Sequence, residues 1–253
     1  MFWCWGRERA NASREKKNRK KNTQASIKIY FIKIFFDFFI VFLIFTVIPV
    51  LVYRFVNPST TPLLWVRWVE SGYSKSHPTF LKHWVPLNQI SPNLVRAVIV
   101  AEDQKFYNHS GFDWQAVEAA IKINFATDKT VGASTISMQT ARNVFLWQDR
   151  NWLRKSLEVW FTFLIENLWA KKRILEVYLN VIEWGNGMFG CEHAALKYYK
   201  HSSATLSPVE SALMASVLPN PRTWSVLHPQ PHVLDRQSKI LSIMTQSHIP
   251  IQY

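Results

Sequence analysis

The arrangement of apolar and polar positions divides this chain into two regions of different character. The longest apolar stretch runs from Ile34 to Val56 and has only Asp37 and Arg54 as ionisable residues. A helix of this length is about 34 Å long, enough to cross a hydrocarbon core of about 30 Å. Downstream, apolar residues recur every three or four positions and show no sustained alternation. The pattern therefore predicts one membrane-spanning helix followed by an all-α domain.

The helices predicted in this domain begin at residues that can cap them. Four such N-terminal signals are present, each a Ser or Asp that can accept a hydrogen bond from the first turn: Ser91, Asp113, Ser134 and Ser207. Pro92 and Pro208 follow two of these caps at the first helical position, where proline is favoured. Together with the apolar spacing, the signals predict helices over residues 91–102, from 113, from 134, and over 152–169, 171–184, 207–218 and 233–244.

Composition supports a folded, helical chain. Apolar residues make up 48% and charged residues 19%, which excludes a disordered chain, and only 7 glycines are present, which disfavours a sheet rich in tight turns. The two cysteines, Cys4 and Cys191, would lie on opposite sides of a membrane and so are not expected to pair. Cys191 is predicted to be a small buried apolar residue.

The positive charge is concentrated before the apolar stretch. Residues 1–33 contain ten Lys or Arg and two Glu, a net of +8 out of +13 for the whole chain. The positive-inside rule then predicts a cytoplasmic N-terminus and an exported C-terminal part. A cleaved signal peptide is the alternative, but its apolar region should be shorter and end in small residues. Nucleic-acid binding by the basic residues is a weaker alternative, because they directly precede a membrane span.

These observations predict four segments. Residues 1–33 are a basic cytoplasmic tail, 34–56 a transmembrane signal-anchor, 57–80 a juxtamembrane connector and 81–253 the exported all-α domain. The connector contains three prolines, Pro58, Pro62 and Pro78, and two tryptophans, Trp65 and Trp68. Aromatic and basic residues just beyond a span suit the lipid headgroup layer, and ordinary core packing explains them equally well.

Carboxylates with neighbouring cations are the candidates for chemistry. Glu102 and Asp103 end an apolar helix, where the helix dipole and partial burial raise a carboxyl pKa and favour a general base. A solvated acidic pair is the alternative. Arg154 and Glu158 lie four residues apart on one helix face, as catalytic groups or as a surface ion pair. A polar stripe of Gln139, Arg142 and Asn143 follows residues 132–135 on an otherwise apolar helix.

Taken in order, these segments resemble the motifs of the peptidoglycan glycosyltransferase family. The matching patterns are Glu-Asp-x-x-Phe-x-x-His-x-Gly at 102–111, Gly-x-Ser-Thr-Ile-x-x-Gln at 132–139, Arg-Lys-x-x-Glu at 154–158 and Lys-x-x-Ile-Leu-Glu-x-Tyr-Leu-Asn at 171–180. The resemblance covers about residues 80–245, and with one anchor and no penicillin-binding domain the chain is similar to the monofunctional biosynthetic members from Gram-negative bacteria. It departs from the pattern at Met138, where the family commonly has Gln, and at Arg142, where it has Lys.

The resemblance implies a lysozyme-like, all-α fold of two lobes, one of which dips into the membrane. It also implies polymerisation of lipid II into glycan strands, with inversion at the sugar carbon and release of undecaprenyl diphosphate. Glu102 matches the catalytic glutamate and Glu158 the second glutamate, either as an orienter of cations or as a metal partner. The residues that match the family's substrate-binding positions are Asp103, Phe106, His109, Gly132, Ser134, Thr135, Gln139, Arg142, Asn143, Arg154 and Lys155.

The resemblance also sets expectations for cofactors, partners and location. No metal-ligand spacing is present, and a divalent cation (Mg or Mn) at the lipid diphosphate is the one cofactor left open. The expected partners are lipid II, the growing glycan strand, membrane lipid and proteins of cell division or wall synthesis, without nucleic acid. The expected location is the bacterial inner membrane, with the catalytic domain periplasmic.

Two other functions remain as alternatives. A membrane-anchored muramidase would also use a lysozyme-like fold, but a glycosidase needs a neutral acid for its leaving group and has no use for clustered cations. A catalytically silent scaffold would tolerate the loss of both glutamates.

Overall fold

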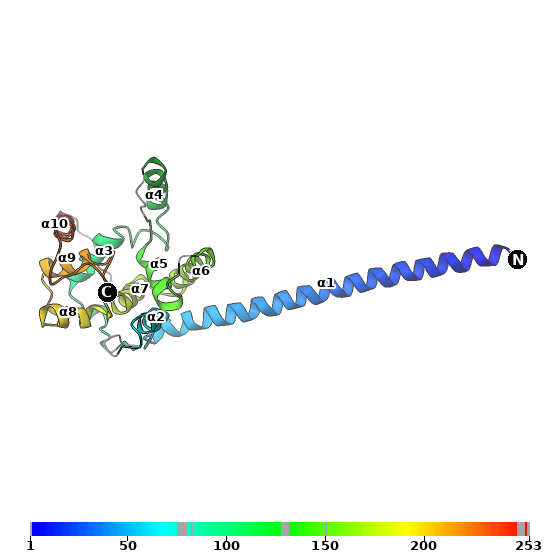
Figure 1. Cartoon of the computed structure of the whole chain (residues 1–253), viewed down its shortest axis with the longest axis horizontal. Coiled ribbons are helices and arrows are strands. Elements are labelled where there is room, and N and C mark those ends of the chain that lie inside the picture. Colours follow the sequence, from blue (N-terminus) through cyan, green and yellow to red (C-terminus); the bar gives the residue numbers. More distant parts are fainter. Residues whose placement is uncertain are drawn as a thin grey trace. The chain divides into compact units, whose positions relative to one another are not determined.

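The computed structural model describes residues 2–74, 80–81, 83–127, 132–149, 151–246 and 251, with the backbone alone for residues 2–27 and 29. The chain forms two compact units, Met1–Pro49 and Val50–Tyr253, and the second contains all the predicted site residues (Figure 1). The basic side chains predicted for the tail up to residue 27, and connector residues 75–79, lie outside what the structure describes.

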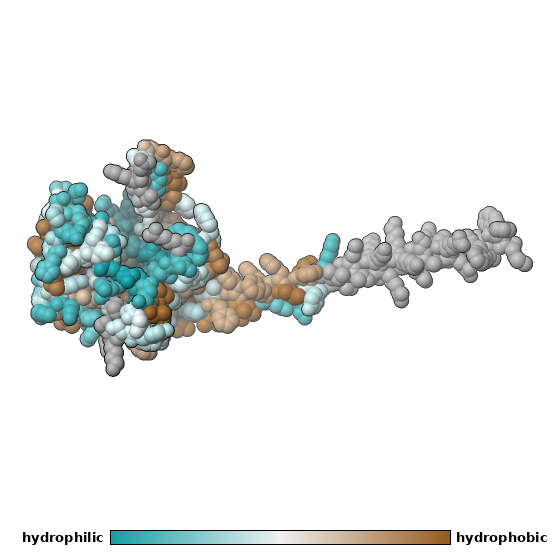
Figure 2. Space-filling model, in the orientation of Figure 1, coloured by the Kyte–Doolittle hydropathy of each residue, from teal (hydrophilic) through white to brown (hydrophobic). Residues whose placement is uncertain are grey.

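The first helix, α1 (Phe2–Phe55), contains the predicted membrane span. Within the described residues, Tyr30–Phe55 is the one helical stretch long and apolar enough to cross a membrane. Large apolar side chains such as Phe35, Phe38 and Phe45 are exposed along it, and Figure 2 shows this stretch as hydrophobic surface. Exposed apolar side chains of this density suit a lipid environment, so a single-pass membrane anchor fits the structure.

The second unit is built almost entirely from helices, as predicted. They are α2 (Pro62–Glu70), α3 (Pro92–Glu102), α4 (Trp114–Ala126), α5 (Ile136–Phe145), α6 (Trp152–Leu168), α7 (Lys171–Val181), α8 (Cys191–Tyr199), α9 (Pro208–Ser216) and α10 (Pro231–Gln246), with short 3₁₀ turns η1 (Leu87–Gln89) and η2 (Ser203–Thr205). A small antiparallel hairpin joins β1 (Glu183–Gly185) to β2 (Met188–Phe189).

Three of the four predicted caps are confirmed. The Ser91 and Asp113 side chains accept from first-turn amides, and Ser207 forms a capping box with Glu210. The prediction for Ser134 is wrong by one residue, since Thr135 caps α5 by accepting from the Met138 amide. The Thr135 hydroxyl also donates to the Gly111 carbonyl at 2.6 Å, a tertiary contact that fixes it at the cap.

Two further differences come from tertiary contacts. The helix predicted over 171–184 ends at Val181, because Glu183 to Phe189 form the hairpin, which turns at Gly187 with a φ of 70°. Glycine adopts this left-handed conformation without a Cβ clash. Helix α2 lies inside the segment predicted as a connector, and α8 was not predicted.

The helices of the second unit pack in two groups. Helices α3, α9 and α10 contact one another, and α2, α5, α6 and α7 form the other group around α5. Helix α4 stands apart from both (Figure 1) and buries only Ala120. Cys191 is a free, buried residue, and burial raises the pKa of its thiol to about 12, as expected for a packing residue.

Candidate active site

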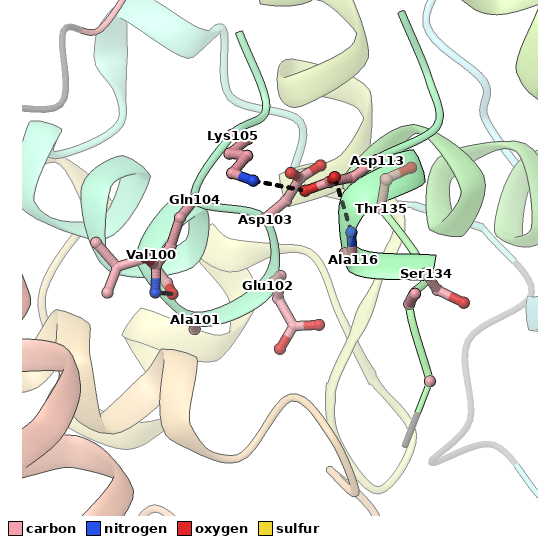
Figure 3. A pocket seen from close by; sticks show the side chains of 12 residues that line it. Val100, Ala101, Glu102, Asp103, Gln104, Lys105, Asp113, Ala116, Ser134 and Thr135 are labelled. Carbon is pink, nitrogen blue, oxygen red and sulfur yellow. Dashed lines mark hydrogen bonds and ion pairs between the residues drawn. The ribbon is translucent and has the colours of Figure 1, made fainter. Parts of the chain in front are cut away.

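Glu102 is the last residue of α3 and faces a cavity. The cavity has a volume of about 330 Å³ and is lined by the end of α3, the start of α4 and the segment that leads into α5. In Figure 3 the Glu102 side chain extends into this space, with Ser134 across from it. The apolar residues of α3, including Val98 and Ile99, are fully buried, so packing of the helix fixes where its last side chain points.

A chain of hydrogen bonds holds the Glu102 carboxylate. The Gln139 side-chain amide donates to Glu102 Oε2 at 2.9 Å, and the Tyr178 hydroxyl donates to Gln139 Oε1 at 3.1 Å. Burial holds the pKa of Tyr178 well above 10.0, so its hydroxyl stays protonated and can donate. Since Gln139 lies on α5 and Tyr178 on α7, these bonds connect the two helix groups at the carboxylate.

Arg236 holds the other side of Glu102. Its NH2 group lies 3.2 Å from Glu102 Oε1 and donates to the Ala101 carbonyl at 3.0 Å. Burial raises the pKa of Glu102 above its usual value, while the Gln139 hydrogen bond and the charges of Arg236 and Arg142 act against this rise. A carboxyl group with a raised pKa is a better base near neutral pH, as predicted for this helix end.

Asp103, His109 and Phe106 lie behind Glu102 and support the backbone. Asp103 Oδ2 accepts from the Ile136 amide at 3.0 Å, and His109 Nε2 lies 2.9 Å from Asp103 Oδ1. His109 Nδ1 accepts from the Gly111 amide, which places the proton of the neutral ring on Nε2. The Phe106 ring is fully buried. Asp103, held by His109, thus ties the end of α3 to the start of α5, and the buried Phe106 has no surface left for a substrate.

Gly132, Ser134 and Thr135 form the opposite wall of the cavity. Ser134 is partly exposed there, whereas Thr135 is buried at the cap of α5. A side chain at Gly132 would meet no atom within 4 Å, so this residue leaves open space beside the cavity. Within this segment, Ser134 offers the hydroxyl best placed for a ligand.

A second, smaller cavity has a volume of about 160 Å³ and includes Gln139 in its lining. It is lined by residues of α2, α5, α7 and neighbouring loops, among them Arg67, Gln139, Arg142, Asn143 and Gln148. Arg142 takes part in no ion pair with any residue that the structure describes, and its buried Nε has no hydrogen-bond partner there. An anionic ligand in this cavity would give the Arg142 guanidinium a charged hydrogen-bond partner.

Arg154, Lys155 and Glu158 form a separate cluster at the start of α6. Arg154 NH1 contacts Glu158 Oε2 and Lys155 Nζ contacts Glu158 Oε1, both at 2.5 Å. The Glu158 side chain is only 1% exposed, whereas that of Lys155 is 41% exposed and available to a ligand. The cluster lines neither of the two cavities, so the described contacts do not join it to Glu102.

The Glu158 cluster does not fit a divalent metal. Both carboxylate oxygens already face cations, which would repel a second positive centre. No group of three or more His, Cys, Asp or Glu side chains with metal-binding geometry occurs in the described part of the chain. Glu158 therefore has the geometry of a residue that orients Arg154 and Lys155.

Sequence reasoning missed Arg236 and the role of Tyr178. Arg236 lies 134 residues beyond Glu102 along the chain, in a helix with no matched motif. Tyr178 belongs to a matched motif, but nothing in its spacing indicated a bond to Gln139. For Arg236, the sequence offered only a basic residue on the last predicted helix, and this did not indicate Glu102 as its partner.

Comparison with known proteins gives two independent matches. A family model described as Transglycosylase matches residues 74–245. The chain is 49% identical over 193 residues to the "Biosynthetic peptidoglycan transglycosylase" of Bdellovibrio bacteriovorus, covering 76% of this chain and 77% of that protein. Proteins of the same name from Rhodospirillum centenum and Pseudomonas syringae are 50% and 47% identical, covering 74% and 79% of this chain and 79% and 85% of theirs.

These matches confirm the family and the lysozyme-like, all-α fold that the motifs implied. They cover the helices that carry Glu102, Gln139, Glu158 and Arg236. This chain is an enzyme of the transglycosylase family.

Proposed function

We propose that this enzyme polymerises lipid II into linear glycan strands of peptidoglycan and releases undecaprenyl diphosphate. The observation that carries the proposal is a buried carboxylate with a raised pKa, Glu102, at a cavity wall between two helix groups. Its hydrogen-bond partner Gln139 shares α5 with Arg142, a cation that forms no ion pair with the residues that the structure describes. A base beside a cation suits transfer of a sugar from a diphosphate.

In this mechanism Glu102 acts as the general base. One of its carboxylate oxygens accepts the proton of a sugar hydroxyl as that oxygen attacks the anomeric carbon of the donor. The new C–O bond forms on the face opposite the diphosphate. The C–O bond between the sugar and the diphosphate breaks, and the diphosphate leaves with the electron pair of that bond. The configuration at this carbon is therefore inverted. Gln139 and Arg236 hold the two carboxylate oxygens so that the lone pair that accepts the proton faces the cavity.

Cations stabilise the leaving group. Negative charge grows on the diphosphate as its bond to the sugar breaks, and preorganised donors lower the energy of that state. Arg142, Arg154 and Lys155 supply such donors, and Glu158 orients the last two. Ser134 and Asn143 contact the sugars or phosphates, while Asp103, His109 and Thr135 position the cavity walls.

The proposal includes the location of the enzyme. The basic residues before the apolar span support a cytoplasmic N-terminus and a periplasmic catalytic domain, anchored in the inner membrane. Lipid II and the growing strand are then both presented at the outer surface of that membrane. The segment boundaries are those given above: tail 1–33, anchor 34–56, connector 57–80 and catalytic domain 81–253.

The test is Glu102→Gln in the full-length, detergent-solubilised protein. The amide keeps the shape of the side chain but cannot accept the proton, so we expect lipid II polymerisation to fall about 10²- to 10⁴-fold. Glu118→Gln, which removes an exposed carboxylate on α4, is the matched control and should retain wild-type activity. Strands that shorten instead of lengthening would identify a muramidase.

The variant should stay folded. An acid whose pKa is raised in the folded protein destabilises the fold when ionised, above that raised pKa, and has no such effect below its unfolded pKa of about 4.5. Glu102→Gln should therefore have a Tm at neutral pH no lower than that of the wild type. A folded variant that polymerises within tenfold of wild type would show that Glu102 is not the base.

A further inference from the structure

The end of α1 is hydrogen-bonded to Trp169, just before α7, and to Arg173 in the first turn of α7. The Trp169 indole donates to the Val50 carbonyl at 2.8 Å. Arg173 donates to the Tyr53 carbonyl through Nε and NH2 and to the Val56 carbonyl at 2.9 Å. All of these residues belong to the second compact unit. The apolar stretch ends at Phe55. In a membrane-anchored enzyme, the first turn of α7 would therefore lie near the point where α1 leaves the bilayer.

A cavity of about 420 Å³ opens beside this junction. Its lining combines apolar and charged side chains and shares no residue with the two cavities of the active site: Arg54, Phe55, Leu87, Asn88, Ala170, Lys172, Arg173 and Glu176. Amphiphilic walls of this kind suit a ligand with a charged head and an apolar continuation.

The free charge in this cavity is positive. Glu176, its single acid, is satisfied by Arg173 NH1 at 2.6 Å and by the Leu87 amide at 3.0 Å. Arg54 and Lys172 are exposed and form no ion pair with any residue in the described part of the chain. The positive end of the α7 dipole lies at the same wall. Arg54 and Lys172, next to the neutralised carboxylate of Glu176, therefore favour the binding of an anionic ligand.

We infer that this cavity binds the phosphate of an anionic phospholipid, such as phosphatidylglycerol, from the leaflet where α1 leaves the membrane. Arg54 and Lys172 contact the phosphate, Asn88 contacts the polar headgroup, and Phe55 and Leu87 contact the glycerol and upper acyl chains. A phosphodiester carries one negative charge, so Arg54 and Lys172 together more than balance it and leave the occupied site with one net positive charge. The bound lipid would hold the domain at a fixed height above the bilayer, through the same α7 that carries Tyr178.

The test uses the full-length protein in neutral detergent and a phosphatidylglycerol with a fluorescent acyl chain, titrated by anisotropy. A basic side chain beside an anionic lipid typically contributes about fivefold in affinity. We therefore expect Arg54→Gln and Lys172→Gln each to weaken binding about fivefold and the double variant about 30-fold. The matched control, Lys197→Gln with Lys239→Gln, removes the same charge from exposed positions outside the cavity and should bind as wild type.

Two further arms identify the ligand. Labelled phosphatidylcholine, which is zwitterionic, should bind more weakly to wild type and lose little in the double variant. A labelled polyprenyl diphosphate should bind equally well to wild type and double variant; a selective loss of this probe would assign the cavity to the substrate lipid and overturn the proposal. Equal phosphatidylglycerol binding by wild type and double variant, or an equal loss in the control, would also overturn it.

The binding result does not depend on catalysis. The double variant should keep the wild-type unfolding midpoint and polymerise lipid II normally in detergent, because it leaves the active site intact. If polymerisation were absent from the wild type itself, the proposed function would fail while the lipid site remained testable.

Discussion

At Glu102, burial and hydrogen bonding act on the same proton in opposite directions. Burial disfavours the ionised carboxylate and raises its pKa, while Gln139, Arg236 and Arg142 stabilise the ionised form. The balance leaves a carboxylate that is a stronger base than a solvated one and is still held in one orientation. Tyr178 acts one step further away, by fixing which end of the Gln139 amide faces Glu102.

This balance predicts a pH effect. Gln139→Ala removes a bond that lowers the Glu102 pKa, so the pKa should rise and the acid limb of the kcat/KM profile should move to higher pH. Tyr178→Phe should move the limb in the same direction by less, because Gln139 can still donate. Initial rates of lipid II polymerisation over a pH series measure both. A limb that moves to lower pH, or stays in place in both variants, would contradict this account.

Individual cations also differ in what their removal should do. Lys155→Ala leaves Arg154 to neutralise the buried Glu158, so it removes a ligand contact with little effect on the fold. Arg142→Ala removes the unpaired cation of the smaller cavity. By analogy with oxyanion-hole donors, each should lower kcat about 10²- to 10³-fold.

The readout for these cations is polymerisation together with binding of a phosphoglycolipid inhibitor, whose phosphate presents a similar anion. Both should weaken in parallel, and Lys197→Ala serves as the exposed control on α8. If both variants polymerised and bound the inhibitor as wild type does, the cations would be surface charges without a role in the leaving-group step.

Among the helices of the second unit, α4 carries large apolar side chains that its packing does not bury. It buries only Ala120, while Trp114 is 72% and Phe125 89% exposed. Figure 2 shows hydrophobic residues on this helix as well as on the membrane span. Apolar residues left in water on a single protruding helix indicate contact with a bilayer or with an apolar substrate chain.

We therefore expect α4 to enter the lipid. In full-length protein with Cys4→Ser, a polarity-sensitive dye at Phe125→Cys should report an apolar environment in vesicles and a polar one in water. The same dye at Leu234→Cys, an exposed apolar position on α10, should report water in both. Water at position 125 in vesicles would mean that α4 does not contact the membrane.

For the whole molecule, the distribution of charge predicts the topology. Of the net charge of +13, +8 precedes the membrane span. A reporter that is active only after export, fused after Tyr253, should therefore be active in cells. Activity of a cytoplasm-only reporter at the same position would reverse the proposed orientation and remove the enzyme from its substrate.

Features that depend on neighbouring residues could be predicted from the amino-acid sequence. Apolar spacing and the caps Ser91, Asp113 and Ser207 predicted most helices within a few residues, because a helix and its cap form from local contacts. The sequence also contains the apolar span, with its length and composition, and the family motifs in their order. The same local pattern made Glu102, an acid at the end of an apolar helix, a candidate base.

Contacts between residues far apart in the chain became visible in the folded structure and could not be predicted from the sequence. Arg236 meets Glu102 across 134 residues, and Tyr178 meets Gln139 across 39. Contact with Gly111 fixes Thr135 at the cap of α5, and pairing with β2 ends α7 at Val181. Each of these contacts depends on which helix surfaces meet in the folded protein. Packing of the whole core decides this, and no local pattern of residues encodes it.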